Sequence, residues 1–219
     1  MLKYSCLVLD HDDTVVQSEA TINYPFFCYI LDQFRPGTTI TKEAYTYGCC
    51  HKGFAQMCRE DFGFSDQELT DEFLQWKQYV RSHVPPPYPG IAEIIHRQKQ
   101  ENGLICVVSH SSEENITRDY RTHFDILPDA IYGWDLPEEK RKPSVFPLID
   151  IMQRYNLTAN QLLVVDDMKP AWQMASKAGV EIAFAGWSRE DCPDIAAEMQ
   201  RLCTYSFQTT KELYDHLFR

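Results

Sequence analysis

The sequence lacks any long hydrophobic run. Apolar runs such as Cys6–Leu9, Leu104–Val108 and Leu162–Val165 are far shorter than the ~20 residues that a transmembrane helix needs. The first apolar run ends at Asp10 and is too short for the core of a signal peptide, and no small-residue cleavage site follows it. We therefore expect a cytoplasmic protein with no membrane partner.

Positive charge is scarce. Lysine and arginine number 21 against 32 aspartate and glutamate residues, which gives a formal net charge of −11. An acidic chain without a polybasic run does not match the electrostatic requirements of a general nucleic-acid binder or of a protein held on an anionic membrane. We expect neither kind of partner.

Cysteine pairs with metal-ligand spacing are also missing. The chain has eight cysteines, and none of them forms a CxxC pair. Structural zinc sites usually need such pairs, so we expect no zinc site. In a reducing cytoplasm the cysteines are expected to be free thiols. With 219 residues, 44% of them apolar, the chain suits one compact domain or a core domain with a modest insertion.

Three short apolar runs without alternation predict strands that are buried on both faces of a parallel sheet. They are Tyr4–Asp10, Leu104–Ser109 and Leu162–Asp167. Amphipathic stretches between and beside them predict helices over Ile91–Gln100, Ser144–Tyr155 and Pro170–Ala178. Strands that alternate with helices predict an α/β fold with a doubly wound parallel sheet.

One long stretch interrupts this alternation. It has no strand-like run and instead predicts helices over Ser18–Gln33, Thr41–Asp61 and Ser65–His83. The proline-rich segment Val84–Gly90 follows, and it cannot be helical. We interpret residues 17–85 as an inserted helical domain and residues 1–16 and 86–219 as the core domain. The alternative is that these helices are part of a single core.

Polar side chains follow each of the three apolar runs. They are Asp10 and Asp12, Ser109 and His110, and Asp166 and Asp167. Ligands of open α/β sheets bind beyond the carboxyl ends of the strands. Crowded carboxylates repel one another, and a hard divalent cation such as Mg²⁺ relieves that repulsion. With Lys142 and a hydroxyl nearby, such a site suits a phosphoryl group.

Each of these residues has a plainer explanation when it is taken alone. An aspartate at a strand end often caps a turn, a serine such as Ser109 often caps a helix, and Lys142 could be a solvated surface lysine. Their joint occurrence, each at its strand edge and in this order, favours a functional site.

The same residues resemble the four motifs of the haloacid dehalogenase superfamily of aspartate-nucleophile phosphatases. Asp10–Thr14 reads DHDDT and resembles the DxDx[T/V] signature. Ser109, Lys142-Pro143 and Asp166-Asp167 match the second, third and fourth motifs at ordinary spacings. The resemblance covers nearly the whole chain. It implies a Rossmann-like core with an inserted helical cap, similar to the phosphoglycolate phosphatase and β-phosphoglucomutase group. It also implies a Mg²⁺-dependent phosphatase of a small phosphorylated metabolite, as a monomer or homodimer.

The resemblance further implies roles for the catalytic residues. Asp10 would be the nucleophile that forms an aspartyl-phosphate. Asp12 would act first as general acid and then as general base, and its backbone carbonyl would bind Mg²⁺. Lys142 would offset the charge on Asp10 and on the phosphate.

The binding residues follow from the same motifs. Ser109 and the backbone N–H of His110 would hold phosphate oxygens, and Thr14 would steady the loop at the phosphate. Asp167, helped by Asp166, would join Asp10 and Asp12 as metal ligands.

The chain departs from the family pattern at four positions. Asp13 replaces the usual glycine and can adopt a left-handed conformation at some cost. His11 replaces an apolar residue; it could contact substrate or pack beneath the cap, and we favour packing. Asp166 replaces a glycine, and Ala171 stands where a later acidic residue is usual.

The insertion is expected to supply substrate specificity as a cap. Its candidate segment is Tyr45–Phe54, with Gly48 and Gly53 on either side of a predicted turn. His51 and Lys52 could meet a polar or anionic leaving group, although Lys52 could also be a solvated lysine. Six aromatic residues are expected to have a packing role and not to contact substrate. Trp76 and Tyr79 are expected in the core of the insertion. Four others are expected either there or packed between the insertion and the core domain: Tyr24, Phe26, Phe27 and Tyr29.

Three other functions remain open from the sequence. A sugar-phosphate mutase shares the core, and a phosphonoacetaldehyde hydrolase would use Lys52 as a Schiff base. A regulatory or binding module could retain the fold without catalysis, although every catalytic position is filled. A dehalogenase is disfavoured, because it needs no acid two residues after its nucleophile and Asp12 is present.

Overall fold

The computed structural model describes residues 2–219 and divides into two compact units. Residues 2–17 and Pro87–Arg219 form one unit, which we call the core unit. Ser18–Pro86 forms the other, which we call the helical insertion. Each unit is described by itself below.

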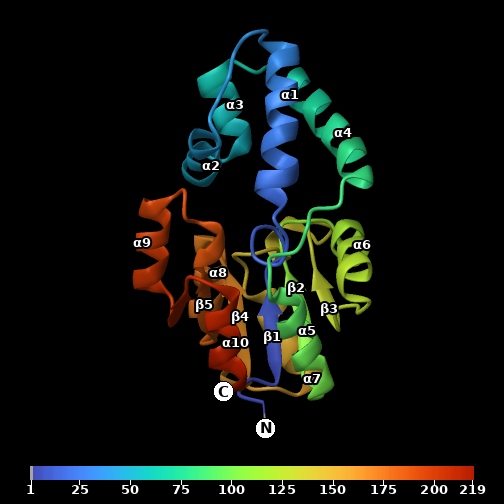
Figure 1. Cartoon of the computed structure of the whole chain (residues 1–219), viewed down its shortest axis with the longest axis vertical. Helices are drawn as coiled ribbons and strands as arrows, with labels where there is room; N and C mark the ends of the chain where they lie inside the picture. Colours follow the sequence, from blue (N-terminus) through green and yellow to red (C-terminus); the bar gives the residue numbers. More distant parts are fainter. Residues whose placement is uncertain (1) are drawn as a thin grey trace. The chain divides into compact units, whose positions relative to one another are not determined.

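The core unit is built on a six-stranded sheet in which every neighbouring pair is parallel (Figure 1). The strands are β1 (Cys6–Leu9), β2 (Leu104–Val108), β3 (Ala130–Tyr132), β4 (Leu162–Asp166), β5 (Glu181–Ala185) and β6 (Tyr205–Phe207). Their spatial order is β3-β2-β1-β4-β5-β6, which is the order of a doubly wound sheet. The predicted fold class is confirmed, and the three predicted strands are the neighbours β2, β1 and β4.

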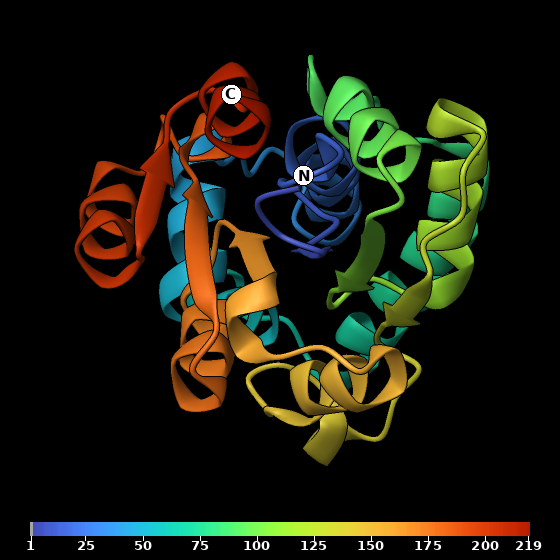
Figure 2. The same ribbon diagram turned by 90° about the horizontal axis from the view of Figure 1, so that it is seen from below.

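Helices cover both faces of this sheet (Figure 2). The core helices are α5 (Ile91–Gln100), α6 (Glu113–Phe124), α7 (Phe146–Tyr155), α8 (Lys169–Ala178), α9 (Pro193–Leu202) and α10 (Thr210–Phe218). Short turns of 3₁₀-helix lie at η2 (Glu138–Lys140), η3 (Ala159–Gln161) and η4 (Gly186–Ser188).

Alternate residues of β1 are buried against the helices on opposite faces of the sheet. Leu7 and Leu9 join the cluster that includes α5, α6 and α10, whereas Cys6 and Val8 join the cluster of α7 and α8. All four are buried, which explains the continuous apolar run.

The position of the site follows from the strand order. From β1 the chain builds outward to β2 and β3, and it then returns to place β4 on the other side of β1. Leu9 pairs with Val107 on one side and with Val165 on the other. The carboxyl ends of β1 and β4 therefore meet where the strand order reverses, which is the usual ligand position in such sheets.

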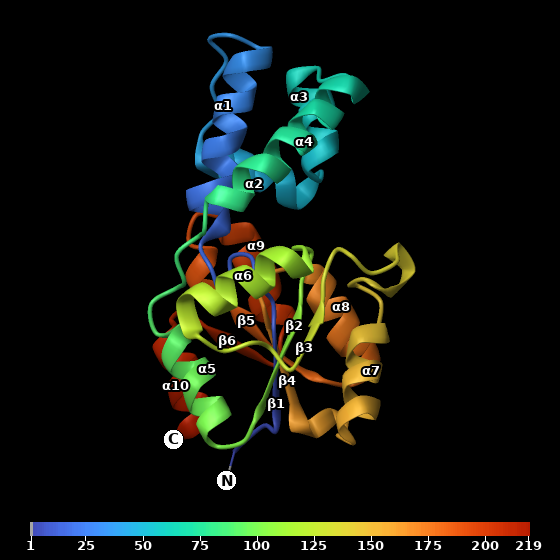
Figure 3. The same ribbon diagram turned by 90° about the vertical axis from the view of Figure 1, so that its right-hand side faces the viewer.

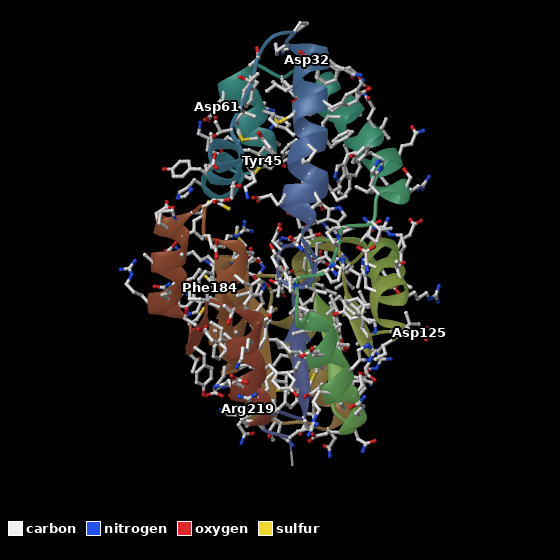
Figure 4. All side chains as sticks on the ribbon, in the orientation of Figure 1. Asp32, Tyr45, Asp61, Asp125, Phe184 and Arg219 are labelled. Carbon is white, nitrogen blue, oxygen red and sulfur yellow. The ribbon has the colours of Figure 1, made fainter. Side chains whose placement is uncertain are left out.

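The helical insertion contains four α-helices that follow a π-helical turn (Figure 3). They are η1 (Glu19–Asn23), α1 (Tyr24–Phe34), α2 (Lys42–His51), α3 (Phe54–Phe62) and α4 (Asp66–Ser82). Thr41 caps α2, and Ser65 forms a capping box with Glu68 at the start of α4. Phe27 and Tyr45 lie at the centre of the apolar core, and Figure 4 shows Tyr45 between α1 and α2.

Three details of the insertion differ from the prediction. The single helix predicted over Thr41–Asp61 is broken at Lys52 and Gly53, where Gly53 has a φ of 83° that favours glycine. Gly48 does not border a turn. It lies inside α2, where a Cβ atom would stand 2.4 Å from the Met57 sulfur. Tyr29, expected in the core of the insertion or packed between the insertion and the core domain, is 54% exposed.

The chain leaves and re-enters the core unit at adjacent points. Val16 and Pro87 form an antiparallel bridge, and the Tyr88 N–H donates to the Val15 carbonyl at 2.9 Å. The Gln17 side-chain amide donates to the Pro87 carbonyl at 3.1 Å. The two chain segments that lead into and out of the insertion are therefore hydrogen-bonded to each other within the core unit.

No helix among residues 2–219 is long and apolar enough to cross a membrane. The eight cysteines all lie within these residues and are free thiols.

Candidate active site

Three buried carboxylates meet at the carboxyl edge of the sheet. Asp10 follows β1, and Asp166 and Asp167 come from the end of β4. One oxygen of each lies within 4.8 Å of the others. The Asp10 N–H donates to the Val165 carbonyl at 2.9 Å, which extends the β1–β4 ladder and fixes the position of the side chain. The structure thus brings together the three aspartates that the sequence placed at neighbouring strand ends.

Lys142 lies among these carboxylates. Its ammonium is 2.7 Å from Asp10 Oδ1 and 2.7 Å from Asp166 Oδ2, and its side chain is 4% exposed. Burial alone would lower the pKa of Lys142, but the charges of Asp10 and Asp166 raise it above the usual lysine range. Lys142 is therefore a permanent cation that links β1 to β4, and not a solvated lysine.

A second cation at this edge was not anticipated from the sequence. Arg189 follows η4, is 5% exposed, and forms an ion pair with Asp167. It lies beyond the end of β5, a strand that was not recognised. Glu181–Ala185 reads EIAFA, and had this short run been assigned as a strand, the same edge rule would have placed Arg189 at the site.

The loop after β1 is held by its own backbone. The N–H groups of Val15 and Val16 donate to the His11 carbonyl at 3.0 and 3.1 Å. Asp13 has a φ of 58°, so it adopts the left-handed conformation expected at this position. The Thr14 hydroxyl donates to Asp167 Oδ1 at 3.4 Å, which connects the loop to the carboxylate cluster.

Ser109 and His110 follow β2. Ser109 is 2% exposed, and its hydroxyl accepts the Ser111 N–H at 3.2 Å. His110 Nε2 lies 2.9 Å from the Lys142 carbonyl, so the imidazole donates there. Burial and the nearby Lys142 charge lower the pKa of His110, which favours the neutral ring. Ser109 therefore belongs to the same sheet edge, and His110 supports the loop that carries Lys142.

His11 is fully buried and packs within the core unit. Its Nε2 lies 3.0 Å from Asp119 Oδ2 on α6, and Asp119 also pairs with Arg118 at 2.7 Å. The His11 ring stacks near Tyr120 with centroids 6.1 Å apart. The Asp119 carboxylate thus gives the buried imidazole a polar partner, in agreement with the expectation that His11 packs.

His51 and Lys52 lie in the helical insertion. The His51 ring stacks on Tyr47 with centroids 4.0 Å apart, and Lys52 forms ion pairs with Asp61 and Glu60. Both residues belong to the helical insertion, which is a compact unit separate from the one that holds the carboxylates, and their contact with a substrate stays a prediction.

The carboxylate cluster suits a divalent cation. Lys142 pairs with Asp10 and Asp166, and Arg189 pairs with Asp167. The three clustered carboxylates outnumber these two cations, and carboxylate oxygens are the ligands that hard cations prefer. Burial raises the pKa values of Asp166 and Asp167, against the charges of Lys142 and Arg189. Both oxygens of Asp166 already accept hydrogen bonds, from Lys142 and from the Met168 N–H. Asp10 is the better candidate for a direct ligand, because only its Oδ1 accepts a hydrogen bond from residues 2–219. Asp167 pairs with Arg189 through Oδ2, but its Oδ1 accepts only a long bond of 3.4 Å from Thr14, so that oxygen is a second candidate.

Comparison with known proteins gives one family match. The family model described as haloacid dehalogenase-like hydrolase matches residues 7–185, which is well over half of the chain. No curated protein matches the sequence.

Solved structures share the fold along nearly the whole chain. A predicted phosphoglycolate phosphatase from Haemophilus somnus 129PT is 14% identical with a TM-score of 0.76, and the match covers 99% of both chains. Mutant CbbY from Rhodobacter sphaeroides in complex with xylulose-(1,5)-bisphosphate is 16% identical with a TM-score of 0.71, covering 97% of this chain and 96% of that one. The haloacid dehalogenase-like family protein SP0104 from Streptococcus pneumoniae is 14% identical with a TM-score of 0.74, covering 98% of both. These likenesses concern the fold.

We expect Lys142→Met to destabilise the protein by about 3–5 kcal/mol, because it leaves Asp10 and Asp166 buried without their cation. Urea unfolding in the presence of a chelator measures the change, since a bound divalent cation would mask part of it.

The matched control is Lys169→Met. Lys169 pairs with Glu198 at the same distance of 2.7 Å, but its side chain is 49% exposed. That change should cost at most about 1 kcal/mol. Equal losses in the two variants would show that Lys142 does not hold the carboxylates together.

Proposed function

The chain belongs to the haloacid dehalogenase-like hydrolase family, and on this premise we propose that it is a Mg²⁺-dependent phosphatase of a small phosphorylated metabolite. The reaction would pass through an aspartyl-phosphate on Asp10. The observation that carries this proposal is the Lys142 ammonium, 2.7 Å from Asp10 and from Asp166 at the point where the strand order reverses.

Asp10 would attack phosphorus. Its Oδ1 is held by Lys142, which leaves Oδ2 to form the new bond. A carboxylate oxygen is the nucleophile that forms the covalent intermediate in such reactions. The bond between phosphorus and the ester oxygen breaks as the new bond forms, and Asp12 would donate a proton to the departing oxygen.

The second step would return Asp10 to its first state. Asp12, now ionised, would remove a proton from water, and the water oxygen would attack phosphorus. The bond to Asp10 then breaks and inorganic phosphate is released. Asp12 is the half-buried carboxyl of the loop, whereas Asp10 is 5% exposed, and this difference supports a proton-transfer role for Asp12.

Asp10 and Asp167 would hold Mg²⁺, together with the Asp12 backbone carbonyl. When bound, the ion supplies positive charge that screens the phosphoryl oxygens from the surrounding carboxylates. Ser109 and the His110 N–H would bind phosphate oxygens from the β2 edge, and Thr14 would steady the loop. Asp166 would contribute mainly by holding Lys142, because both of its oxygens accept hydrogen bonds.

The substrate would be a small phosphomonoester. The proteins of like fold include a predicted phosphoglycolate phosphatase and a CbbY complex with a sugar bisphosphate, which supports this size and chemistry. We propose that the helical insertion acts as the cap that selects the substrate, with His51 and Lys52 as candidate contacts. A panel of sugar phosphates, nucleotides and phosphoglycolate would identify the substrate.

Lys52 argues against a C–P hydrolase. A Schiff-base lysine must lose its proton, which requires a lowered pKa. The ion pairs with Asp61 and Glu60 instead raise the pKa of Lys52. No observation favours the mutase or the non-catalytic module over the phosphatase.

We expect Asp10→Asn to reduce turnover of p-nitrophenyl phosphate below about 1% of the wild-type rate, because an amide is a poor nucleophile and loss of a covalent nucleophile usually costs several orders of magnitude. Asp125→Asn is the matched control. Asp125 is exposed in the same unit, at a φ of 52° that asparagine tolerates. A residual rate above about 1% in Asp10→Asn would exclude Asp10 as the nucleophile.

We expect activity to require Mg²⁺ and to be inhibited by Ca²⁺. Mg²⁺ demands short octahedral contacts, whereas Ca²⁺ takes more ligands at longer range and could draw both Asp10 oxygens away from phosphorus. Mg²⁺ should also raise the melting temperature of the wild-type protein, and less so that of Asp10→Asn. Full activity in excess chelator would contradict this assignment.

We expect Asp12→Ala to slow both half-reactions. A p-nitrophenolate leaving group needs little protonation, so the first half-reaction should be less impaired than with an alkyl phosphate, by part of the ~10²–10⁴-fold that general acid–base catalysis contributes. Aspartyl-phosphate should accumulate on Asp10. Single-turnover kinetics with mass spectrometry of the quenched enzyme measure both effects. Equal slowing for both esters without phosphoenzyme would mean that Asp12 is structural.

A further inference from the structure

The helical insertion contains a cavity of its own, of about 330 Å³. It lies among η1, α2, α3 and α4, and its volume falls in the ~300–1,000 Å³ range typical of small-molecule sites. The walls used in the argument below are Glu19, Tyr45, Phe54, Glu72, Phe73 and Trp76. All of them belong to the insertion, so the cavity is defined without reference to the core unit.

Glu72 is the unusual wall residue. It lies on α4, is only 7% exposed, and lines the cavity. No hydrogen bond or ion pair from residues 2–219 reaches its carboxylate. A buried carboxylate without a partner is costly, and native proteins rarely retain one without a ligand or a function for it. Its carboxylate therefore has unused capacity for a cation that enters the cavity.

The other walls are largely aromatic. Tyr45 is buried, and the rings of Phe73 and Trp76 stack with centroids 6.3 Å apart and planes 17° apart. The Trp76 Nε1–H donates to Asn23 Oδ1 at 3.1 Å, which fixes the orientation of the indole. Faces of aromatic rings attract cations, tryptophan most strongly, and aromatic cages of this kind bind quaternary ammonium groups.

A cationic side chain beside this wall leaves Glu72 unpaired. The Lys77 ammonium lies 5.6 Å from the centroid of Phe73 but forms no ion pair with Glu72. Glu19 adds a second carboxylate to the cavity, and its Oε1 accepts a hydrogen bond from the Thr46 hydroxyl. The cavity thus carries negative charge within apolar walls.

We propose that this cavity binds an organic ammonium ion, with Glu72 as the counter-ion and Trp76 and Tyr45 as the ring faces. A small metal ion would need several oxygen ligands, which aromatic walls do not supply. A neutral apolar molecule would leave the Glu72 carboxylate unpaired. The proposal does not rest on the phosphatase reaction, because it concerns binding within the insertion.

The ionisation of Glu72 adds a separate signature. Burial raises the pKa of Glu72 to about 7. The other titratable groups that line the cavity or sense the Glu72 charge are Glu19, Tyr45, Cys49 and Cys58. Burial raises the pKa of Tyr45 well above 10 and that of Cys58 to about 12, so both stay neutral near pH 7. Affinity for an ammonium ion should therefore rise between pH 6 and pH 8, as Glu72 loses its proton.

The test is a calorimetric titration of the full chain with choline and with 3,3-dimethylbutan-1-ol, which has the same shape without the charge. We expect saturable choline binding, at least tenfold weaker binding of the neutral alcohol, and a choline affinity that increases from pH 6 to pH 8. Equal binding of the two molecules, or no saturable binding of choline, would overturn the proposal.

The matched variants are Glu72→Gln and Glu60→Gln. Both remove one carboxylate from the insertion, but Glu60 is exposed on α3 and does not line the cavity. Glu72→Gln should bind choline at least tenfold more weakly and lose the pH dependence, whereas Glu60→Gln should bind like the wild type. Removal of a buried charge should leave the melting temperature of Glu72→Gln at pH 8 unchanged or higher, so lost binding cannot be ascribed to unfolding. Unchanged choline binding by Glu72→Gln would exclude the assigned counter-ion.

A second experiment tests whether the ammonium group belongs to the substrate or to a separate molecule. If the ammonium group is part of the substrate, kcat/KM for phosphocholine should exceed that for 3,3-dimethylbutyl phosphate at least tenfold, and Glu72→Gln should remove the preference. If the cation is a free molecule, the two esters should react alike while choline still binds. Failure of both esters to react would count against the phosphatase reaction and leave the binding result intact.

Discussion

The arrangement of the core unit depends on the charge balance around Lys142. Its ammonium contacts Asp10 after β1 and Asp166 at the end of β4, so one cation joins the two neighbouring strands at which the strand order reverses. Without it, three carboxylates would share a buried space and repel one another. Arg189 completes the balance from the loop beyond β5. The sheet edge is thus stable enough to fold while retaining carboxylate oxygens that suit a divalent cation.

The sequence predicted those parts whose signal is local. Continuous apolar runs identified β1, β2 and β4, and the abrupt polar residues after them identified Asp10, Ser109, Asp166 and Asp167. Strands farther from the centre of the sheet gave a weaker signal. The run of three residues at β6 is only partly buried, and β5 begins with Glu181, whose carboxylate accepts the Tyr4 hydroxyl. Arg189 was missed for the same reason, since its place at the site depends on β5.

Other features depend on contacts that no local pattern contains. The Asp119 partner of His11 lies on α6, more than a hundred residues along the chain. In the insertion, Gly48 resembles a turn residue, yet it is inside α2 because Met57 of α3 packs where a side chain would be. Glu72 carries a carboxylate, which usually favours exposure, and is nevertheless buried. In each case long-range packing overrides the local preference.

The bridge between Val16 and Pro87 has a consequence for how the chain folds. The pairing of β1 with β2 joins Cys6 to Leu104, and the whole insertion lies between these two residues in the sequence. The entropy lost when a loop closes grows with the length of flexible chain that separates its ends. An insertion that has already formed its own apolar core is no longer a flexible loop, so its two ends start closer together. Early folding of the insertion should therefore accelerate the assembly of the central sheet. Substitutions that slow the folding of the insertion should delay formation of the carboxylate cluster in the core unit, although the substituted residues are not part of that cluster.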